Sequence, residues 1–322
     1  LMIFGNWPIE ETEGAMLAYA IAAGSHSFRK GTLLTRDQIK ILGQQGITHV
    51  FAARLEEYDI GEDEAALAIG KLLISDNIEP GKPVTGRINL FARHDGLFHA
   101  DATAIDKINL LDSRISVATL RNDCRVKGGQ MVATVKIIPF AVPAMLIESL
   151  HILQGGQNVL DVRSFKATKI GMIQSQLPTI RDTVLDKTTE LIAKRVERNH
   201  GSVIKECRVA HEQDAIAKAI DELLSSCDVV LIFSAASIAD AADIVPRSIV
   251  ASGGEILRIG MPVDPGNLLV LAQCRTKPIV VAPGSARSAR ENSLDWVLDR
   301  LMANMDLTAN DLGKMGVGGL LL

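Results

Sequence analysis

The second half of the chain alternates short apolar runs with longer stretches whose apolar residues recur at helical spacing. The apolar runs predict β-strands over residues 169–174, 202–207, 228–233, 268–272 and 278–282. The stretches between and after them predict helices over residues 179–199, 214–225, 239–251 and 286–304. The uninterrupted apolar run at 228–233 is typical of a central strand in a parallel sheet. This alternation predicts a three-layer α/β/α domain built on a doubly wound sheet.

The first half follows a different pattern, in which helical periods give way to turn-rich β segments. Helices are expected over residues 9–22 and 65–74 and directly after Thr35, which can act as a cap. Residues 80–140 predict hairpins, one turning at Asp95-Gly96 and one pairing residues 115–120 with 130–138. We therefore divide the chain into an N-terminal α+β region at 1–165, an α/β domain at 166–304 and a Gly-rich tail or linker at 305–322.

Composition narrows the class of protein. The net charge is −4, no basic block stands out, and two Trp and two Tyr offer few rings for stacking, so nucleic-acid binding is disfavoured. The most apolar run, at 137–153, is broken by Pro139, Pro143 and Glu148, and we expect no membrane span. The four cysteines have no C-x-x-C spacing and are expected to be reduced, which is typical of a cytoplasmic protein.

Candidate chemistry gathers in three turns that follow predicted strands. Because ligands of open α/β sheets bind beyond the carboxyl ends of the strands, these turns should converge on one edge. Their candidate ligand-binding residues are Ser234, Ala235, Ala236 and Ser237; Asp264, Pro265 and Gly266; and Pro283, Gly284, Ser285, Arg287 and Ser288. The third turn joins glycine, hydroxyls and arginines to a helix start, a combination that favours anions. The alternative is a plain strand-to-helix turn with solvated arginines.

The order of these motifs resembles the molybdopterin-binding domain of MoeA, MogA and gephyrin-type proteins of molybdenum-cofactor biosynthesis. Residues 228–243 are similar to that family's serine-glycine turn and following aspartate. Gly253-Gly254-Glu255, Pro265-Gly266, Pro283-Gly284-Ser285 and Asp186 stand where the family has its Gly-Gly-Glu, Pro-Gly and Asp motifs. The segments 262–269, 286–288 and 295–298 further resemble a bacterial subgroup in which a MobA-like nucleotidyltransferase domain often follows.

The resemblance implies a function in late molybdenum-cofactor biosynthesis. The ligand would be molybdopterin or its adenylate, with the phosphate held by the turn at 283–290. Asp240 and Asp243 are the expected catalytic residues, and Asp186 and Asp243 the expected metal ligands, with Mg²⁺ as the metal. The role would be molybdate insertion or nucleotide transfer. The resemblance also implies a homo-oligomer and a nucleotidyltransferase domain or protein as partner.

Two departures from the family pattern leave an alternative open. Ala235-Ala236 replaces a glycine pair, which narrows the approach of a ligand to the backbone. The family's acidic turn after the first strand reads Ser175-Gln176-Leu177-Pro178-Thr179 and lacks its carboxylate. A non-catalytic cofactor-binding scaffold that serves a nucleotidyltransferase is therefore the rival hypothesis. An unrelated α/β enzyme acting on a nucleotide or sugar phosphate has no G-x-G-x-x-G or Walker loop to support it.

Overall fold

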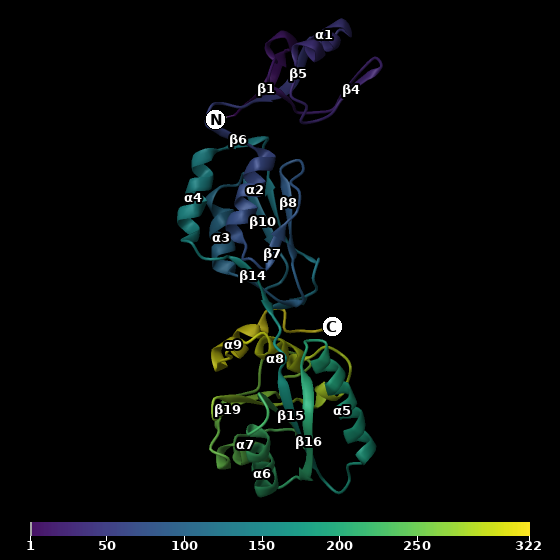
Figure 1. Cartoon of the computed structure of the whole chain (residues 1–322), viewed down its shortest axis with the longest axis vertical. Coiled ribbons are helices and arrows are strands. Elements are labelled where there is room, and N and C mark those ends of the chain that lie inside the picture. Colours follow the sequence, from purple (N-terminus) through teal and green to yellow (C-terminus); the bar gives the residue numbers. More distant parts are fainter. Residues whose placement is uncertain (1) are drawn as a thin grey trace. The chain divides into compact units, whose positions relative to one another are not determined.

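The protein is described by a computed structural model that covers residues 2–322, and the chain divides after Arg163 into two compact units (Figure 1). The first unit begins with a small sheet in the order β1-β5-β2, a two-stranded sheet β3-β4 and one helix. These elements are β1 (Ile3–Pro8), the 3-10 turn η1 (Ile9–Glu11), β2 (Met16–Leu17), β3 (Ile21–Ala23), β4 (His26–Phe28), α1 (Arg36–Gln44) and β5 (His49–Arg54). Thr35 caps α1 through a capping box, as predicted.

The helix predicted over residues 9–22 is wrong. Gly14 has a φ of 75° and turns the chain, and β2 then pairs with β5, so that Leu17 lies opposite Ala52. Long-range pairing thus overrides a local apolar period that also fits a helix.

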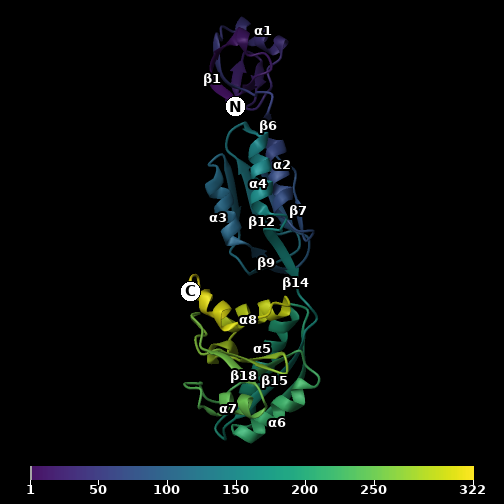
Figure 2. The ribbon, with the colours of Figure 1, turned by 90° about the vertical axis from the view of Figure 1, so that its left-hand side faces the viewer.

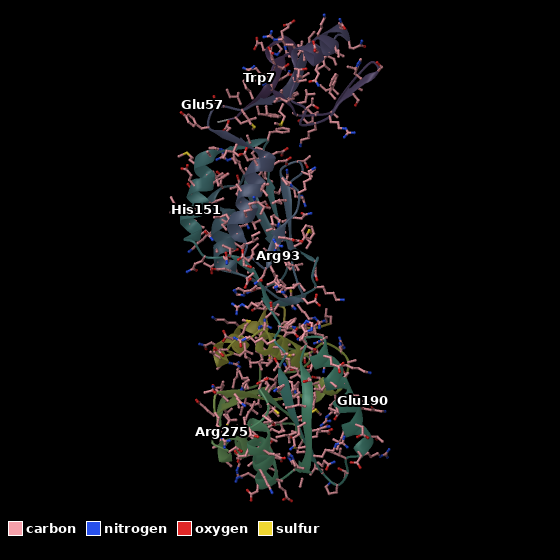
Figure 3. All side chains as sticks on the ribbon, in the orientation of Figure 1. Trp7, Glu57, Arg93, His151, Glu190 and Arg275 are labelled. Atoms are coloured by element: carbon pink, nitrogen blue, oxygen red, sulfur yellow. The ribbon has the colours of Figure 1, made fainter. Side chains whose placement is uncertain are left out.

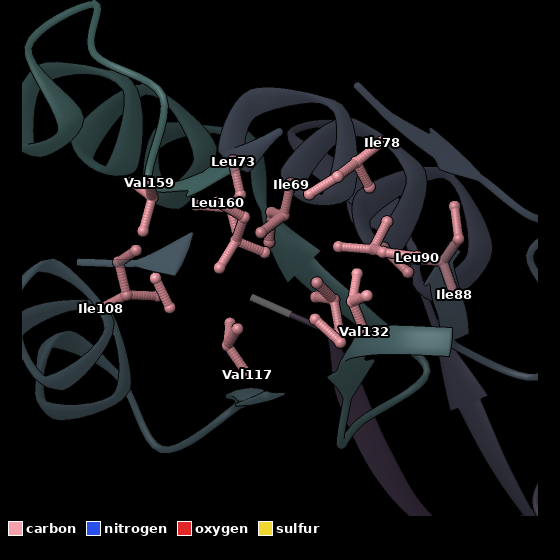
Figure 4. Close-up of a cluster of buried hydrophobic side chains, with 14 of the residues drawn as sticks. Ile69, Leu73, Ile78, Ile88, Leu90, Ile108, Val117, Val132, Val159 and Leu160 are labelled. Carbon is pink, nitrogen blue, oxygen red and sulfur yellow. The ribbon is translucent and has the colours of Figure 1, made fainter. Parts of the chain in front are cut away.

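The rest of the first unit packs three helices on short antiparallel sheets. Its elements are β6 (Asp59–Gly61), α2 (Glu62–Leu73), β7 (Ile78–Pro80), β8 (Arg87–Ala92), β9 (Gly96–Ala100), α3 (Ala102–Leu111), β10 (Ile115–Thr119), β11 (Cys124–Val126), β12 (Met131–Ile137), β13 (Ala141–Pro143), α4 (Ala144–Gln154) and β14 (Leu160–Ser164). Figure 4 shows the buried core, in which Ile69 and Leu73 of α2 meet Leu90, Val132 and Leu160 from the strands.

The two predicted hairpins of this unit have different outcomes. The pairing of 115–120 with 130–138 is confirmed, since β10 and β12 are antiparallel with Ile115 opposite Ile137. The Asp95-Gly96 hairpin is wrong, because β8 pairs with β7 and β12 whereas β9 lies between β11 and β14. At Gly96 a Cβ would lie 2.4 Å from the carbonyl oxygen of Arg163, so this glycine permits close strand approach rather than a two-residue turn.

The second unit is the predicted α/β domain. Its elements are β15 (Lys169–Gln176), α5 (Asp182–Glu197), β16 (Ser202–Ala210), α6 (Gln213–Leu224), β17 (Val229–Phe233), α7 (Ile244–Ala251), β18 (Glu255–Ile259), β19 (Val270–Cys274), β20 (Lys277–Val281), the 3-10 turn η2 (Gly284–Arg287), α8 (Ser293–Met302), α9 (Ala309–Gly313) and the 3-10 turn η3 (Lys314–Gly316).

Six strands of this unit form one sheet in the order β16-β15-β17-β20-β19-β18. The first four are parallel, and β19 runs antiparallel to its neighbour β20. The edge strand β18 is antiparallel to β19 and therefore runs in the same direction as the first four. Figure 2 shows α6 and α7 on one side of the sheet and α5 and α8 on the other, which confirms the three-layer α/β class. Charged residues such as Glu190 of α5 and Arg275 of the β19–β20 turn are exposed on the outside (Figure 3).

The segment at 305–322, for which the sequence predicts a tail or linker, packs on the second unit. Leu307, Leu312 and Met315 are buried. The backbone N–H of Asp264 donates to the carbonyl of Gly319, and the N–H of Leu321 donates to the carbonyl of Asp264. Between residues 2 and 322, no helix is both long enough and apolar enough to span a membrane.

Candidate functional site

A small pocket lies beyond the carboxyl ends of β17 and β20, at the edge where parallel strands place ligands. Its volume is about 160 Å³. The lining residues are Phe233, Ser234, Ala235, Ala236, Ser237, Ile238, Leu268, Ala282, Pro283, Gly284 and Arg287. The first and third predicted turns therefore do meet, and Leu268, three residues beyond Pro265, joins them.

Arg287 is the cation of this pocket, and its contacts are with neutral groups. One guanidinium nitrogen, Nη1, donates to Oε1 of Gln174 at 3.2 Å and to Oγ1 of Thr188 at 2.8 Å. The guanidinium carbon lies 5.1 Å from the centre of the Phe233 ring. No carboxylate pairs with Arg287 in the part of the chain that the structure describes, 2–322, and burial lowers its pKa below the ordinary value. A half-buried arginine without a counter-ion is suited to receive an anion.

The turn after β17 is anchored by Ser175. The sequence analysis noted this residue only as part of a turn that lacks the family's carboxylate. Ser175 is fully buried at the end of β15, and its hydroxyl oxygen accepts the N–H of Ala235 at 2.9 Å. The same oxygen lies 2.9 Å from Nδ1 of His211, which follows β16. Ser175 thus ties together the ends of three neighbouring strands, and in doing so sets the position of Ala235.

The turn after β20 is held by Arg195 of α5, which sequence reasoning missed. Its guanidinium donates to the carbonyl oxygens of Ala286 at 2.8 Å, Ser288 at 3.0 Å and Arg290 at 3.1 Å. The available signal was its position on the predicted helix, three residues after Ile192 on the apolar face. A charged residue at such a position is a candidate for a specific buried partner.

The two serines of that turn differ in surroundings. Oγ of Ser285 is buried and has no hydrogen-bond partner among residues 2–322. Ser288 is exposed, and its Oγ accepts the N–H of Arg290 at 3.3 Å. Neither serine is among the residues that line the pocket.

The second predicted turn, Asp264-Pro265-Gly266, lies against the start of α8 rather than in the pocket lining. The Ser293 hydroxyl donates to the carbonyl of Gly266 at 2.7 Å. Gly266 has a φ of 126°, and a Cβ there would come 2.1 Å from the Ser293 hydroxyl oxygen. This turn positions Leu268 and the adjoining strand β19.

The carboxylates of the predicted acidic site residues make hydrogen bonds or ion pairs within the protein and do not line the pocket. Asp243 is the N-cap of α7, where its Oδ1 accepts the N–H of Ile244 at 2.7 Å. Oδ1 of Asp240 accepts the N–H of Ala242 at 2.8 Å, and the residue is exposed. Neither lines the pocket.

Asp186 and Asp243, the expected metal ligands, belong to helices on opposite sides of the sheet (Figure 2). Asp186 lies on α5, and its carboxylate is 2.7 Å from Nη2 of Arg208. In residues 2–322 there is no group of three or more His, Cys, Asp or Glu side chains that could hold a metal ion. A Mg²⁺ ion at this edge would therefore have to take several of its ligands from the substrate phosphate and water.

Comparison with known families finds a match for most of the second unit. Residues 163–303 match the family model described as the probable molybdopterin binding domain. The match confirms, for this part of the chain, the resemblance drawn from the order of its turns. A search of curated protein sequences finds no significant match.

A search of solved structures also returned matches, at low sequence identity and low TM-score. The MoeA molybdopterin biosynthesis protein of Pyrococcus horikosii is 13% identical, with 97% of this chain and 77% of that chain covered and a TM-score of 0.32. A molybdenum cofactor biosynthesis protein from Pyrococcus furiosus is 11% identical, with 95% and 66% covered and a TM-score of 0.27. The CinA protein of Thermoplasma acidophilum is 13% identical, with 38% and 90% covered and a TM-score of 0.28.

Proposed function

We propose that the domain at residues 163–303, a match to the probable molybdopterin binding domain, binds molybdopterin or its adenylate with a phosphate beside Arg287. The observation that carries this proposal is a half-buried guanidinium that has only neutral partners among residues 2–322. A phosphate would supply the missing negative charge and accept charge-assisted hydrogen bonds from it. The hydroxyl of Ser234, which lines the same pocket, can donate a further bond.

The size of the pocket limits what it can enclose. A volume of about 160 Å³ is below the ~300–1,000 Å³ of sites that enclose a drug-sized ligand. We therefore assign the phosphate to the pocket and the pterin to the open edge outside it, beside Leu268 and the exposed residues Ala236 and Ser237. The remaining predicted ligand residues, at 264–266 together with Ser285 and Ser288, would then act by shaping the walls of the pocket.

The test is calorimetric titration of the protein with molybdopterin, comparing Arg287→Met with Arg290→Met. Losing hydrogen bonds to a charged group costs about 1.5–3 kcal/mol, so Arg287→Met should weaken binding about 10- to 100-fold. Arg290 is exposed in the same turn and serves as the control, with less than about a 3-fold change expected. Absence of binding by the unaltered protein, or equal affinity in Arg287→Met, refutes the proposal.

A second candidate function is a scaffold that holds the cofactor for a nucleotidyltransferase without performing chemistry. It is favoured by the carboxylates of Asp240, Asp243 and Asp186, each of which accepts a hydrogen bond or ion pair within the protein. In the catalytic candidate, Asp240 would use its other oxygen with Mg²⁺ in late cofactor biosynthesis. A turnover assay with adenylylated molybdopterin, Mg²⁺ and molybdate separates the two, because only the enzyme releases product.

A further inference from the structure

Arg195 of α5 is a buried charged side chain that makes several hydrogen bonds near the candidate pocket. Its side chain is 4% exposed, and Nε lies 2.9 Å from Oδ1 of Asp295, itself 3% exposed. The two terminal nitrogens make the three bonds to Ala286, Ser288 and Arg290 described above. Four of the five N–H donors of a guanidinium are thereby accounted for.

Burial of this charge carries a desolvation cost, which lowers the pKa of Arg195, while Asp295 opposes the shift. Such a group is retained only when its partners are well placed. Three of those partners are backbone carbonyls of one short segment, at alternate positions 286, 288 and 290. The other hydrogen bonds of the segment's backbone are local, such as that from the N–H of Ser288 to the carbonyl of Ser285. Among residues 2–322, Arg195 therefore makes the long-range hydrogen bonds that hold the backbone of this turn.

The residue between the first two of those carbonyls is Arg287. Because Ala286 and Ser288 are bound to one rigid guanidinium, the backbone on both sides of Arg287 is fixed relative to α5. The same helix supplies Thr188, which receives the Arg287 side chain. Helix α5 thus contacts both the backbone beside Arg287, through Arg195, and the side chain of Arg287, through Thr188.

We propose that Arg195, fixed by Asp295, is a positioning residue that presents Arg287 to the bound anion. It acts through the turn at 286–290 and does not line the pocket. The inference rests on the proposed function, since it names the residue that orders that same site. A lysine cannot replace it, because one ammonium group cannot reach three carbonyls in a fixed fork.

The experiment titrates the full chain with inorganic phosphate and follows the amide NMR signals of residues 234–237 and 284–288. Arg195→Lys should weaken phosphate binding by about 10-fold or more. Arg198→Met is the matched control, because Arg198, the C-cap residue of the same helix, pairs with the same Asp295 carboxylate but bonds to none of the three carbonyls. It should change the affinity by less than about 3-fold.

A double variant distinguishes positioning from general destabilisation. If Arg195 acts through Arg287, phosphate should bind Arg195→Lys/Arg287→Met no more weakly than Arg287→Met alone. Losses that multiply, or an Arg195→Lys variant that binds like the unaltered protein, overturn the inference.

Hydrogen exchange of the free protein tests the same tie without ligand. The amides of residues 286–290 should exchange faster in Arg195→Lys than in Arg198→Met. Equal exchange rates in the two variants overturn the positioning role, whether or not the unaltered protein binds phosphate. Failure of the unaltered protein to bind phosphate is a separate result, which refutes the proposed function.

Discussion

At the scale of single residues, the candidate site depends on which charged side chains have partners. Arg287 has neutral contacts, whereas Arg208 is engaged by both Asp186 and Glu206. The two arginines lie on the same side of the sheet and are linked through Gln174, which accepts from Arg287 and donates to Glu206 at 2.8 Å. The Arg208 guanidinium is thus neutralised by carboxylates of the protein, whereas the Arg287 guanidinium contacts neutral groups, as the proposed phosphate site requires.

Glu206 should make stability depend on acid pH. Burial raises its pKa, but hydrogen bonds from Arg208, Gln174 and Thr189 outweigh that effect and hold the pKa below the ordinary 4.5. The stabilisation is present above pH 4.5 and is lost as pH falls through the lowered pKa. We expect Glu206→Gln to flatten the decline in unfolding free energy between about pH 5 and about pH 2.5, measured by urea unfolding. Exposed Glu190→Gln is the control, and an equal decline in both variants would contradict the prediction.

At the scale of elements, the pocket is formed by the turns that follow the ends of β17 and β20. β17 and β20 end side by side, and their following turns are tied to β15 by Ser175 and to α5 by Arg195. The predicted helix over 286–304 begins only at Ser293, because Asn292 forms a capping box there. Residues 284–287 therefore lie outside the helix and form the 3-10 turn that contains Arg287.

Gly266→Ala should disrupt the junction between the second turn and α8. The backbone φ of 126° disfavours any side chain, and the added Cβ would meet the Ser293 backbone nitrogen at 2.8 Å as well as its hydroxyl. We expect a loss of roughly 2–4 kcal/mol in unfolding free energy. Gly284→Ala has no atom within 4 Å of its Cβ position and should cost less than about 1 kcal/mol. Comparable losses in chemical denaturation of the two variants would show that crowding at Ser293 is not the cause.

At the scale of the whole molecule, each unit has its own hydrophobic core. The core of residues 65–162 shares no member with the one between α6, α7 and the six-stranded sheet. Every residue that lines the candidate pocket belongs to the second unit. Phosphate binding should therefore be a property of that unit by itself.

A fragment of residues 164–322 is expected to fold cooperatively and to bind phosphate like the full chain. Shortening it to 164–304 removes the buried Leu307, Leu312 and Met315, each worth about 1.5–3 kcal/mol before ordering costs, and the strand bridge between Asp264 and Leu320. We expect the shorter fragment to lose at least about 2 kcal/mol of unfolding free energy in urea. Equal stability of the two fragments would mean that residues 305–322 act only as a linker.

Local spacing in the sequence determined the alternation of strands and helices in the α/β domain, five of the six strands of its sheet, and the first and third turns that meet at one edge. Hydrophobic period and turn chemistry are read over a few residues, whereas the edge strand β18 (Glu255–Ile259) was not predicted. The family match bears out that reading for residues 163–303. Only the tertiary structure decided that residues 16–17 form a strand against β5, that Asp186 faces Arg208 and that Arg195 ties the Arg287 turn to α5. Those outcomes depend on partners distant in sequence, whose choice is set by burial and pairing across the whole domain.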